Sequence, residues 1–134
     1  VGGFAPIKDI YKTDVWALAT WRNAQAVAAG QTPPIPERSI TKEPSAELRP
    51  DQKDSDSLPD YALLDQVLRA YVDEDHGYEA LLADGFDPEL VRRVISLVDK
   101  AEYKRRQYPP GTKVSGRAFG KDRRLPMTSR WNEK

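Results

Sequence analysis

The residues best suited to chemistry lie near the end of the chain, in the stretch FGKDRRLP at positions 119–126. Gly120 lets the backbone come close to a ligand, and Pro126 limits how the stretch can move. The stretch could bind a phosphate, coat a surface or solvate a tail, and residue types alone leave all three roles open. Its charged side chains are those of Lys121, Asp122, Arg123 and Arg124.

This stretch belongs to a longer basic strip. Between Lys104 and Arg130 the chain has nine Lys or Arg residues and one acid, Asp122. Such strips commonly contact phosphates, and aromatic rings between the cations can stack on bases. A free-standing helical module that binds nucleic acid or an acidic partner is therefore one hypothesis, and a solvated basic terminus is the other. The interleaved rings are Tyr108, Phe119 and Trp131.

Other candidate groups are weaker. His76, the single histidine, lies among acids in DEDHG and favours a surface or capping role over metal binding. Asp54 and Asp56 lack the glycine turn and final glutamate of a calcium loop, so solvated loop charge is the better interpretation. The chain contains no GxGxxG, GxxxxGK[ST], HExxH or GxSxG motif.

Composition narrows the class of protein. The 134 residues suffice for one domain at most, with 39% hydrophobic and 31% charged residues. Lys plus Arg equals Asp plus Glu at 21 each, so any electrostatic function must be local. Without cysteine, the chain offers no disulfide, thiolate metal site or cysteine nucleophile. Neither a membrane span nor a signal peptide is evident, which predicts a cytoplasmic protein, and the opening VGG suggests a fragment of a longer chain.

The elements that must position these groups are helices and loops. Thr13 is predicted to cap a helix over 12–30, with Asp14 in its first turn and Gly30 as its left-handed stop. Its apolar residues cover more than one face, which predicts burial on two sides. The segment 31–58 and the adjoining Pro59 contain six prolines in 29 positions, which predicts an extended loop rather than a helix.

A helical region is predicted over 59–107. An amphipathic helix follows Pro59, a short helix ends at Gly85, and a longer one begins with Asp87 as its cap and Pro88 at its first position. The YPPG sequence ends that helix, and 108–134 form an irregular basic tail. The predicted fold class of this chain is therefore mainly α.

Several stretches resemble the C-terminal part of NAD synthetase, of the long glutamine-dependent bacterial type. They are the opening GGFAPIKDIY, then PSAELRP, DSLP, KRRQ and FGKDRRLP, in the family's order, and the resemblance covers nearly all of the chain. It implies the helical end of an α/β, Rossmann-like synthetase domain of the ATP-pyrophosphatase type. The SGGxDS phosphate loop and the N-terminal amidase domain of the family are absent from these residues.

The resemblance also implies an activity. Family members use ATP to adenylylate the nicotinate carboxylate of deamido-NAD, releasing pyrophosphate, and ammonia from glutamine then displaces AMP to give NAD. Magnesium accompanies ATP, and the synthetase domains form a homodimer. The fragment alone is expected to lack activity. Phe4 and Ala5 stand where ammonia-dependent members often have an aspartate, which favours the glutamine-dependent type.

Three residues match ligand positions of the family. Lys12, after APIKDIY, matches a lysine that contacts ATP, although a lysine that merely starts the helix is the alternative interpretation. Ser45, in KEPSAEL, matches a Thr or Ser near ATP. Lys121 matches the deamido-NAD-binding lysine, with Asp122, Arg123 and Arg124 as candidate neighbours. No catalytic or metal-binding residue is assigned, and the 31–58 segment is expected to lie over the active site and to become ordered with ligands.

Overall fold

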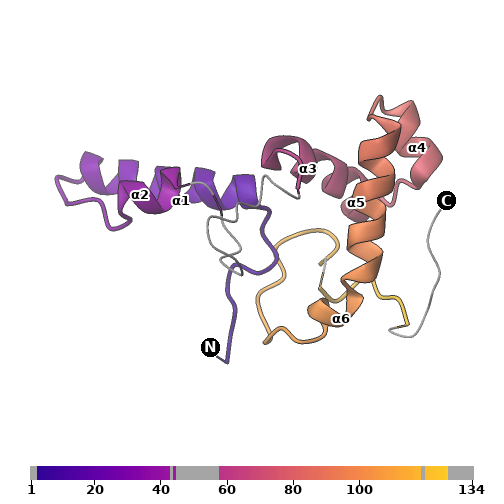
Figure 1. The fold of residues 1–134 in the computed structure, drawn as a ribbon. Coiled ribbons are helices and arrows are strands. Elements are labelled where there is room, and N and C mark those ends of the chain that lie inside the picture. The colour runs from indigo at the N-terminus through magenta and orange to yellow at the C-terminus, as the bar shows by residue number, and fades with distance from the viewer. Residues whose placement is uncertain (1–2, 43, 45–57, 119, 127–134) are drawn as a thin grey trace, which may run out of the picture. The chain divides into compact units, whose positions relative to one another are not determined.

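The structure, a computed structural model, describes residues 3–42, 44, 58–118 and 120–126 (Figure 1). Throughout these residues every regular element is helical, which confirms the mainly α prediction for this chain. The chain divides into two compact units, one formed by Tyr11–Ala62 and the other by Val1–Ile10 with Leu63–Lys134.

The Tyr11–Ala62 unit is built on helix α1 (Lys12–Ala28). The helix begins one residue before Thr13, since the extended backbone of Tyr11 marks its N-terminal boundary. The prediction that Thr13 caps this helix is therefore wrong, because Thr13 already lies in the first turn. Gly30 does adopt the predicted left-handed conformation, with φ of 69°.

A second helix corrects the prediction of a loop without helix over 31–58. Helix α2 (Glu37–Thr41) follows the extended Pro36 and carries Glu37 in its first turn, where the helix dipole favours an acid. The chain between the two helices is held by Asn23, which donates to the Ile35 carbonyl at 2.8 Å and accepts from the Ile35 amide at 3.1 Å. Proline-rich composition thus concealed a short helix, and one side chain of α1 holds the chain just before it.

The apolar residues of α1 are largely uncovered. Ala26 is its one buried residue, and Leu18, Trp21 and Val27 are exposed. The predicted burial on two sides is therefore wrong for this structure. Trp16 packs edge-on against Tyr61, with ring centroids 5.6 Å apart.

The other unit holds the hydrophobic core. Helix α3 (Tyr61–Leu68) runs into this unit and continues as a π-helical turn η2 (Arg69–Asp73). Helices α4 (Tyr78–Ala83) and α5 (Pro88–Lys100) pack side by side (Figure 1). Burial at spacings of three and four residues places one face of α5 in the core. The largest fully buried side chains are Val67, Tyr71, Val72, Leu81, Val91, Val94 and Ile95.

Helix α5 starts as predicted but ends earlier. Asp87 caps it by accepting from the amides of Glu89 and Leu90, and Gly85 closes the preceding turn with φ of 92°. The predicted single helix to 107 is wrong, since the chain breaks at Ala101 and restarts as α6 (Glu102–Arg105). The Val98 carbonyl accepts from the Ala101 amide at 3.2 Å and from Arg105 Nη1 at 2.7 Å, and these two hydrogen bonds stabilise the break.

The helices of the described residues are all too short or too polar to cross a membrane.

Candidate functional site

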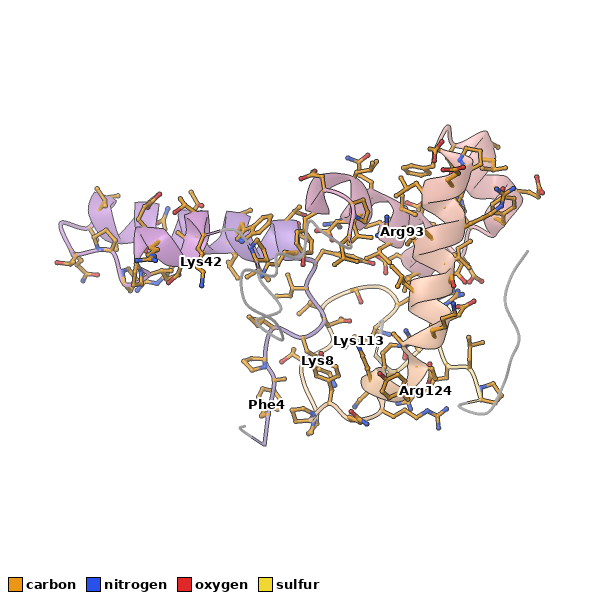
Figure 2. All side chains as sticks on the ribbon, in the orientation of Figure 1. Phe4, Lys8, Lys42, Arg93, Lys113 and Arg124 are labelled. Carbon is orange, nitrogen blue, oxygen red and sulfur yellow. The ribbon has the colours of Figure 1, made fainter. Side chains whose placement is uncertain are left out.

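The tail beyond α6 lies against the N-terminal segment of the same unit. Lys8 donates from Nζ to the Pro109 carbonyl at 2.8 Å, and the Ala5 amide donates to the Pro110 carbonyl at 2.9 Å. Figure 2 shows Lys8 and Lys113 projecting from these two segments. Gly111 is required at this contact, because a Cβ there would collide with the Ala5 carbonyl and the Lys8 side chain.

Asp9 fixes the next part of the tail. Its Oδ2 atom accepts from the Val114 amide at 2.9 Å, the Ser115 amide at 3.0 Å and the Ser115 hydroxyl at 2.8 Å. A carboxylate that accepts from adjacent backbone amides holds the loop in one conformation. The N-terminal segment therefore shapes the loop over 109–115 from more than a hundred residues away in sequence.

Lys121 and Asp122 lie in a tight turn. The Ala118 carbonyl accepts from the amides of both residues, at 3.0 and 2.8 Å. Asp122 Oδ2 accepts from Lys113 Nζ at 2.5 Å and from the Ala118 amide at 2.9 Å. The hydrogen bond from Lys113, followed by that from the Ala118 amide, lowers the pKa of Asp122 below its ordinary value. Its ionised carboxylate thus closes the turn that presents Lys121.

A hollow of about 340 Å³ opens beside this turn. Lys121 is exposed at its edge, and the Tyr108 ring, 62% exposed, forms part of its wall. Its cations outnumber its carboxylates, so it favours an anionic ligand, and the aromatic wall offers a stacking surface. The hollow is lined by Lys8, Asp9, Arg105, Tyr108, Gly111, Thr112, Lys113, Ala118, Gly120, Lys121 and Asp122.

Arg123 and Arg124 do not line the hollow beside Lys121. The Arg123 guanidinium lies over the Tyr71 ring, 3.9 Å from its centroid, and only 14% of the side chain is exposed. Arg124 Nε donates to the Lys121 carbonyl at 3.3 Å. Both residues line a second, more open hollow of about 550 Å³, together with Asp122 but without Lys121. The candidate neighbours thus divide between two hollows.

A buried acid supports the base of the tail. Glu102 accepts from Arg105 Nη2 at 2.8 Å and from Arg106 Nε at 2.9 Å. Arg106 also donates to the Leu125 carbonyl at 2.9 Å, which ties the end of FGKDRRLP to α6. Burial alone would raise the pKa of Glu102, but hydrogen bonds from Arg106 and Arg105 outweigh it and hold the pKa below its ordinary value.

His76 lies against the acid that follows helix α4. Its Nδ1 lies 2.7 Å from Asp84 Oδ2, and its backbone amide donates to the Ala70 carbonyl. Within the described residues, no three His, Asp or Glu side chains are grouped closely enough to hold a metal ion. Asp54 and Asp56 lie outside the described residues.

The two residues matched to ATP-binding positions lie in the first half of the chain. Lys12 starts α1 in the Tyr11–Ala62 unit, with its Nζ 5.6 Å from the Trp16 ring centroid. Ser45 lies outside the described residues, as do Phe119 and Trp131 of the basic strip. The hollow beside Lys121 and its lining residues belong to the other unit.

Sequence reasoning missed several residues of the site. Lys8 and Asp9 stand in APIKDI without any motif of their own, and their partners are the distant Pro109, Val114 and Ser115. Lys113 was counted only as one cation of the basic strip. The nearest sequence signal is YPPG at 108–111, which predicts a turn but not its contact with the N-terminal segment.

Several known proteins are similar to this chain in sequence. Residues 1–108 match the sequence description of the NAD synthase family. The glutamine-dependent NAD(+) synthetase of Acinetobacter baylyi is 55% identical over 131 residues, which cover 98% of this chain and 24% of that protein. The enzyme of the same name from Aquifex aeolicus is 48% identical over 97% of this chain and 22% of its own length. The chain thus spans about a quarter of these curated relatives.

A solved structure shows the same likeness in three dimensions. It is that of glutamine-dependent NAD+ synthetase from Acinetobacter baumannii in complex with adenosine diphosphate, with 45% identity and a TM-score of 0.54. The superposition covers all of this chain and 22% of that one. Because the family match extends over well more than half of its residues, this chain belongs to the NAD synthase family.

Proposed function

We propose that this chain is the C-terminal part of a glutamine-dependent NAD synthetase. The observation that carries the proposal is 55% identity to an enzyme of that name over 98% of the chain. In the whole enzyme the nicotinate carboxylate of deamido-NAD attacks the α-phosphorus of ATP, and pyrophosphate leaves. Ammonia derived from glutamine then attacks the adenylylated carbonyl, AMP leaves, and the amide of NAD is formed.

Lys121 is the residue that we assign to deamido-NAD. Its exposed ammonium stands at the edge of a hollow shared with Lys8 and Lys113, so a dinucleotide phosphate would meet several positive charges there. Lys113 is paired with Asp122, which leaves Lys121 as the cation presented by the turn. The exposed ring of Tyr108 would lie beside a bound heteroaromatic ring.

Lys12 and Ser45 are assigned to ATP. An ammonium at Lys12 would neutralise charge that grows on the phosphates as pyrophosphate leaves, and a hydroxyl at Ser45 would donate to a phosphate oxygen. The complex of the Acinetobacter baumannii relative with ADP supports nucleotide binding by this family. The segment 31–58 would lie over the bound nucleotide.

The remaining parts of the proposal concern the whole protein. The rest of the synthetase domain would supply the parallel sheet and phosphate loop of a Rossmann-like fold, and two copies would form a cytoplasmic homodimer. Magnesium would accompany ATP in that enzyme. Within the part of the chain that the structure describes, no group of three or more His, Asp or Glu side chains could hold the ion.

The test is Lys121→Ala in the whole enzyme, with KM measured separately for deamido-NAD and ATP. Loss of one charge-assisted hydrogen bond should raise KM for deamido-NAD about tenfold and leave KM for ATP nearly unchanged. Lys104→Ala is the matched control, since Lys104 is exposed on α6 and outside the hollow. Unchanged use of deamido-NAD by Lys121→Ala would refute the assignment of Lys121.

A further inference from the structure

Arg123 forms a buried cluster with two residues of the helical core. Its guanidinium covers the Tyr71 ring, and its Nη2 lies 3.7 Å from Asp99 Oδ1. The Tyr71 hydroxyl donates to the same oxygen at 3.1 Å. Tyr71 comes from η2 and Asp99 from α5, and the Asp99 side chain is only 3% exposed. Arg123 is therefore the point at which the tail enters the core.

The position of Asp99 in this cluster is unfavourable for the stability of the fold. Asp99 lies in the last turn of α5, where the negative end of the helix dipole disfavours a carboxylate, and burial disfavours it further. Within the described residues, Asp99 Oδ2 and Arg123 Nε have no hydrogen-bond partner. A buried ion pair with incomplete hydrogen bonding is poor evidence for stabilisation, and holding one arrangement of the chain is its better-supported use.

A second carboxylate faces the same guanidinium. Asp75 has a left-handed backbone with φ of 62°, which is unfavourable for a residue with a side chain. Its Oδ1 lies 2.6 Å from Arg117 Nη1 and 3.8 Å from Arg123 Nη1. The strained turn after η2 thus aims one carboxylate at two arginines of the tail.

Arg123 is joined to Lys121 by a short, fully braced piece of chain. The turn at Ala118 fixes the amides of Lys121 and Asp122, and Arg124 donates to the Lys121 carbonyl. These bonds hold the backbone on both sides of Asp122, so Lys121 and Arg123 belong to one short turn whose two ends face different surroundings. Lys121 is exposed at the hollow while Arg123, two residues later, points inward.

We propose that Arg123 is a positioning residue, seated on Tyr71 and Asp99, that directs Lys121 toward the dinucleotide. This inference rests on the proposed function, because it takes Lys121 as the residue that contacts deamido-NAD. Arg123 itself does not touch the ligand. The planar guanidinium is required, since a lysine would keep the charge but could not lie flat on the ring.

Arg123→Lys in the whole enzyme tests the proposal. KM for deamido-NAD should rise about fivefold to tenfold, while kcat and KM for ATP change less than about twofold. Hydrogen exchange of the Lys121 and Asp122 amides should become faster, because the turn loses its anchor. Arg92→Lys is the matched control, since Arg92 also lies over a tyrosine ring, 5.2 Å from the Tyr78 centroid, but is exposed on α5. Arg92→Lys should change neither KM for deamido-NAD nor the exchange of the Lys121 and Asp122 amides.

A double variant separates positioning from a general loss of structure. If Arg123 acts through Lys121, Arg123→Lys should add less than about a further twofold to KM when Lys121 is already alanine. A fivefold to tenfold further rise in KM for deamido-NAD when Arg123→Lys is added to Lys121→Ala would overturn the proposal. So would an Arg123→Lys single variant in which both this KM and the amide exchange are unchanged. Unchanged KM in Lys121→Ala alone would refute the ligand assignment, and exchange would still decide whether Arg123 holds the turn.

Asp99→Asn provides a second route should Arg123→Lys fail to fold. It keeps the shape of the side chain and an oxygen for the Tyr71 hydroxyl, but removes the charge opposite Arg123. The expected result is a smaller rise in KM for deamido-NAD, about threefold, with exchange faster at Lys121 and Asp122. Unchanged exchange at both amides would overturn the anchoring role.

Discussion

Glu102 shows how one carboxylate can organise the base of the tail. It is buried, yet it accepts from both Arg105 and Arg106, and these two arginines also donate to the carbonyls of Val98 and Leu125. The acid thus joins the end of α5, helix α6 and the end of FGKDRRLP. Removing its charge would leave two guanidinium groups without their shared partner.

Glu102→Gln is therefore predicted to loosen α6 by about 3 kcal/mol at neutral pH. Because the folded pKa of Glu102 lies below its unfolded value of about 4.3, its stabilisation is present above that value and is lost as pH falls through the folded pKa. The local stability of α6 can be measured by hydrogen exchange of its amides, corrected for intrinsic rates. The difference in this stability between wild type and Glu102→Gln should shrink below about pH 4. Glu79→Gln, at an exposed acid of α4, is the control and should leave the exchange of the α6 amides unchanged. A stability difference between wild type and Glu102→Gln that persisted at low pH would contradict an ionised Glu102 paired with the two arginines.

At the scale of elements, the N-terminal segment and the tail loop form one structural piece. They meet through backbone contacts of Ala5 and side-chain contacts of Lys8 and Asp9, and the approach is closest at Gly111. This packing builds one wall of the hollow beside Lys121 from the two ends of the unit's sequence.

Gly111→Ala should displace this contact, because the new Cβ would meet the Ala5 carbonyl, and backbone cannot yield as a flexible side chain does. The expected cost is about 1 to 3 kcal/mol of local stability, seen as faster exchange of the Val114 and Ser115 amides, with a raised KM for deamido-NAD. Gly116→Ala is a matched control in the same loop, since no atom lies within 4 Å of its added Cβ. Equal effects of the two substitutions would refute the close-packing argument.

At the scale of the whole molecule, the charge balance argues against a nucleic-acid module. The chain has 21 basic and 21 acidic residues, and much of the positive strip is neutralised within the fold. The tail cations paired with carboxylates are Arg105, Arg106, Lys113, Arg117 and Arg123. Few cations of the described tail are left to contact a polyphosphate backbone.

The whole protein is therefore expected to bind a labelled single-stranded DNA only weakly, with Kd above about 10 μM at physiological salt. Since each phosphate contact contributes a slope of about −0.7 for single strands, fluorescence anisotropy over a salt series should give a slope shallower than about −2. Tight binding with a slope near −5 would restore the binding-module hypothesis.

Patterns of neighbouring residues correctly predicted where several helices begin and end. Asp87 and Pro88 mark the start of α5, and Gly30 and Gly85 end their helices, because capping and left-handed backbone depend on neighbouring residues. The errors arose where a distant or unexpected contact decided the outcome. Arg105 donates to the Val98 carbonyl at the break after α5, and Asn23 holds the chain that leads into α2.

The sequence by itself determined the helical class of the chain and its family resemblance. It could not assign separate roles within KDRR, because the sequence does not show to which side the backbone turns each of four adjacent charged side chains. The tertiary structure decided that Asp122 pairs with Lys113, that Arg123 enters the core at Tyr71 and Asp99, and that Asp9 holds Ser115. Lys113 lies nine residues before Asp122 and the other partners lie much farther apart in sequence, so only the folded chain brings these groups into contact.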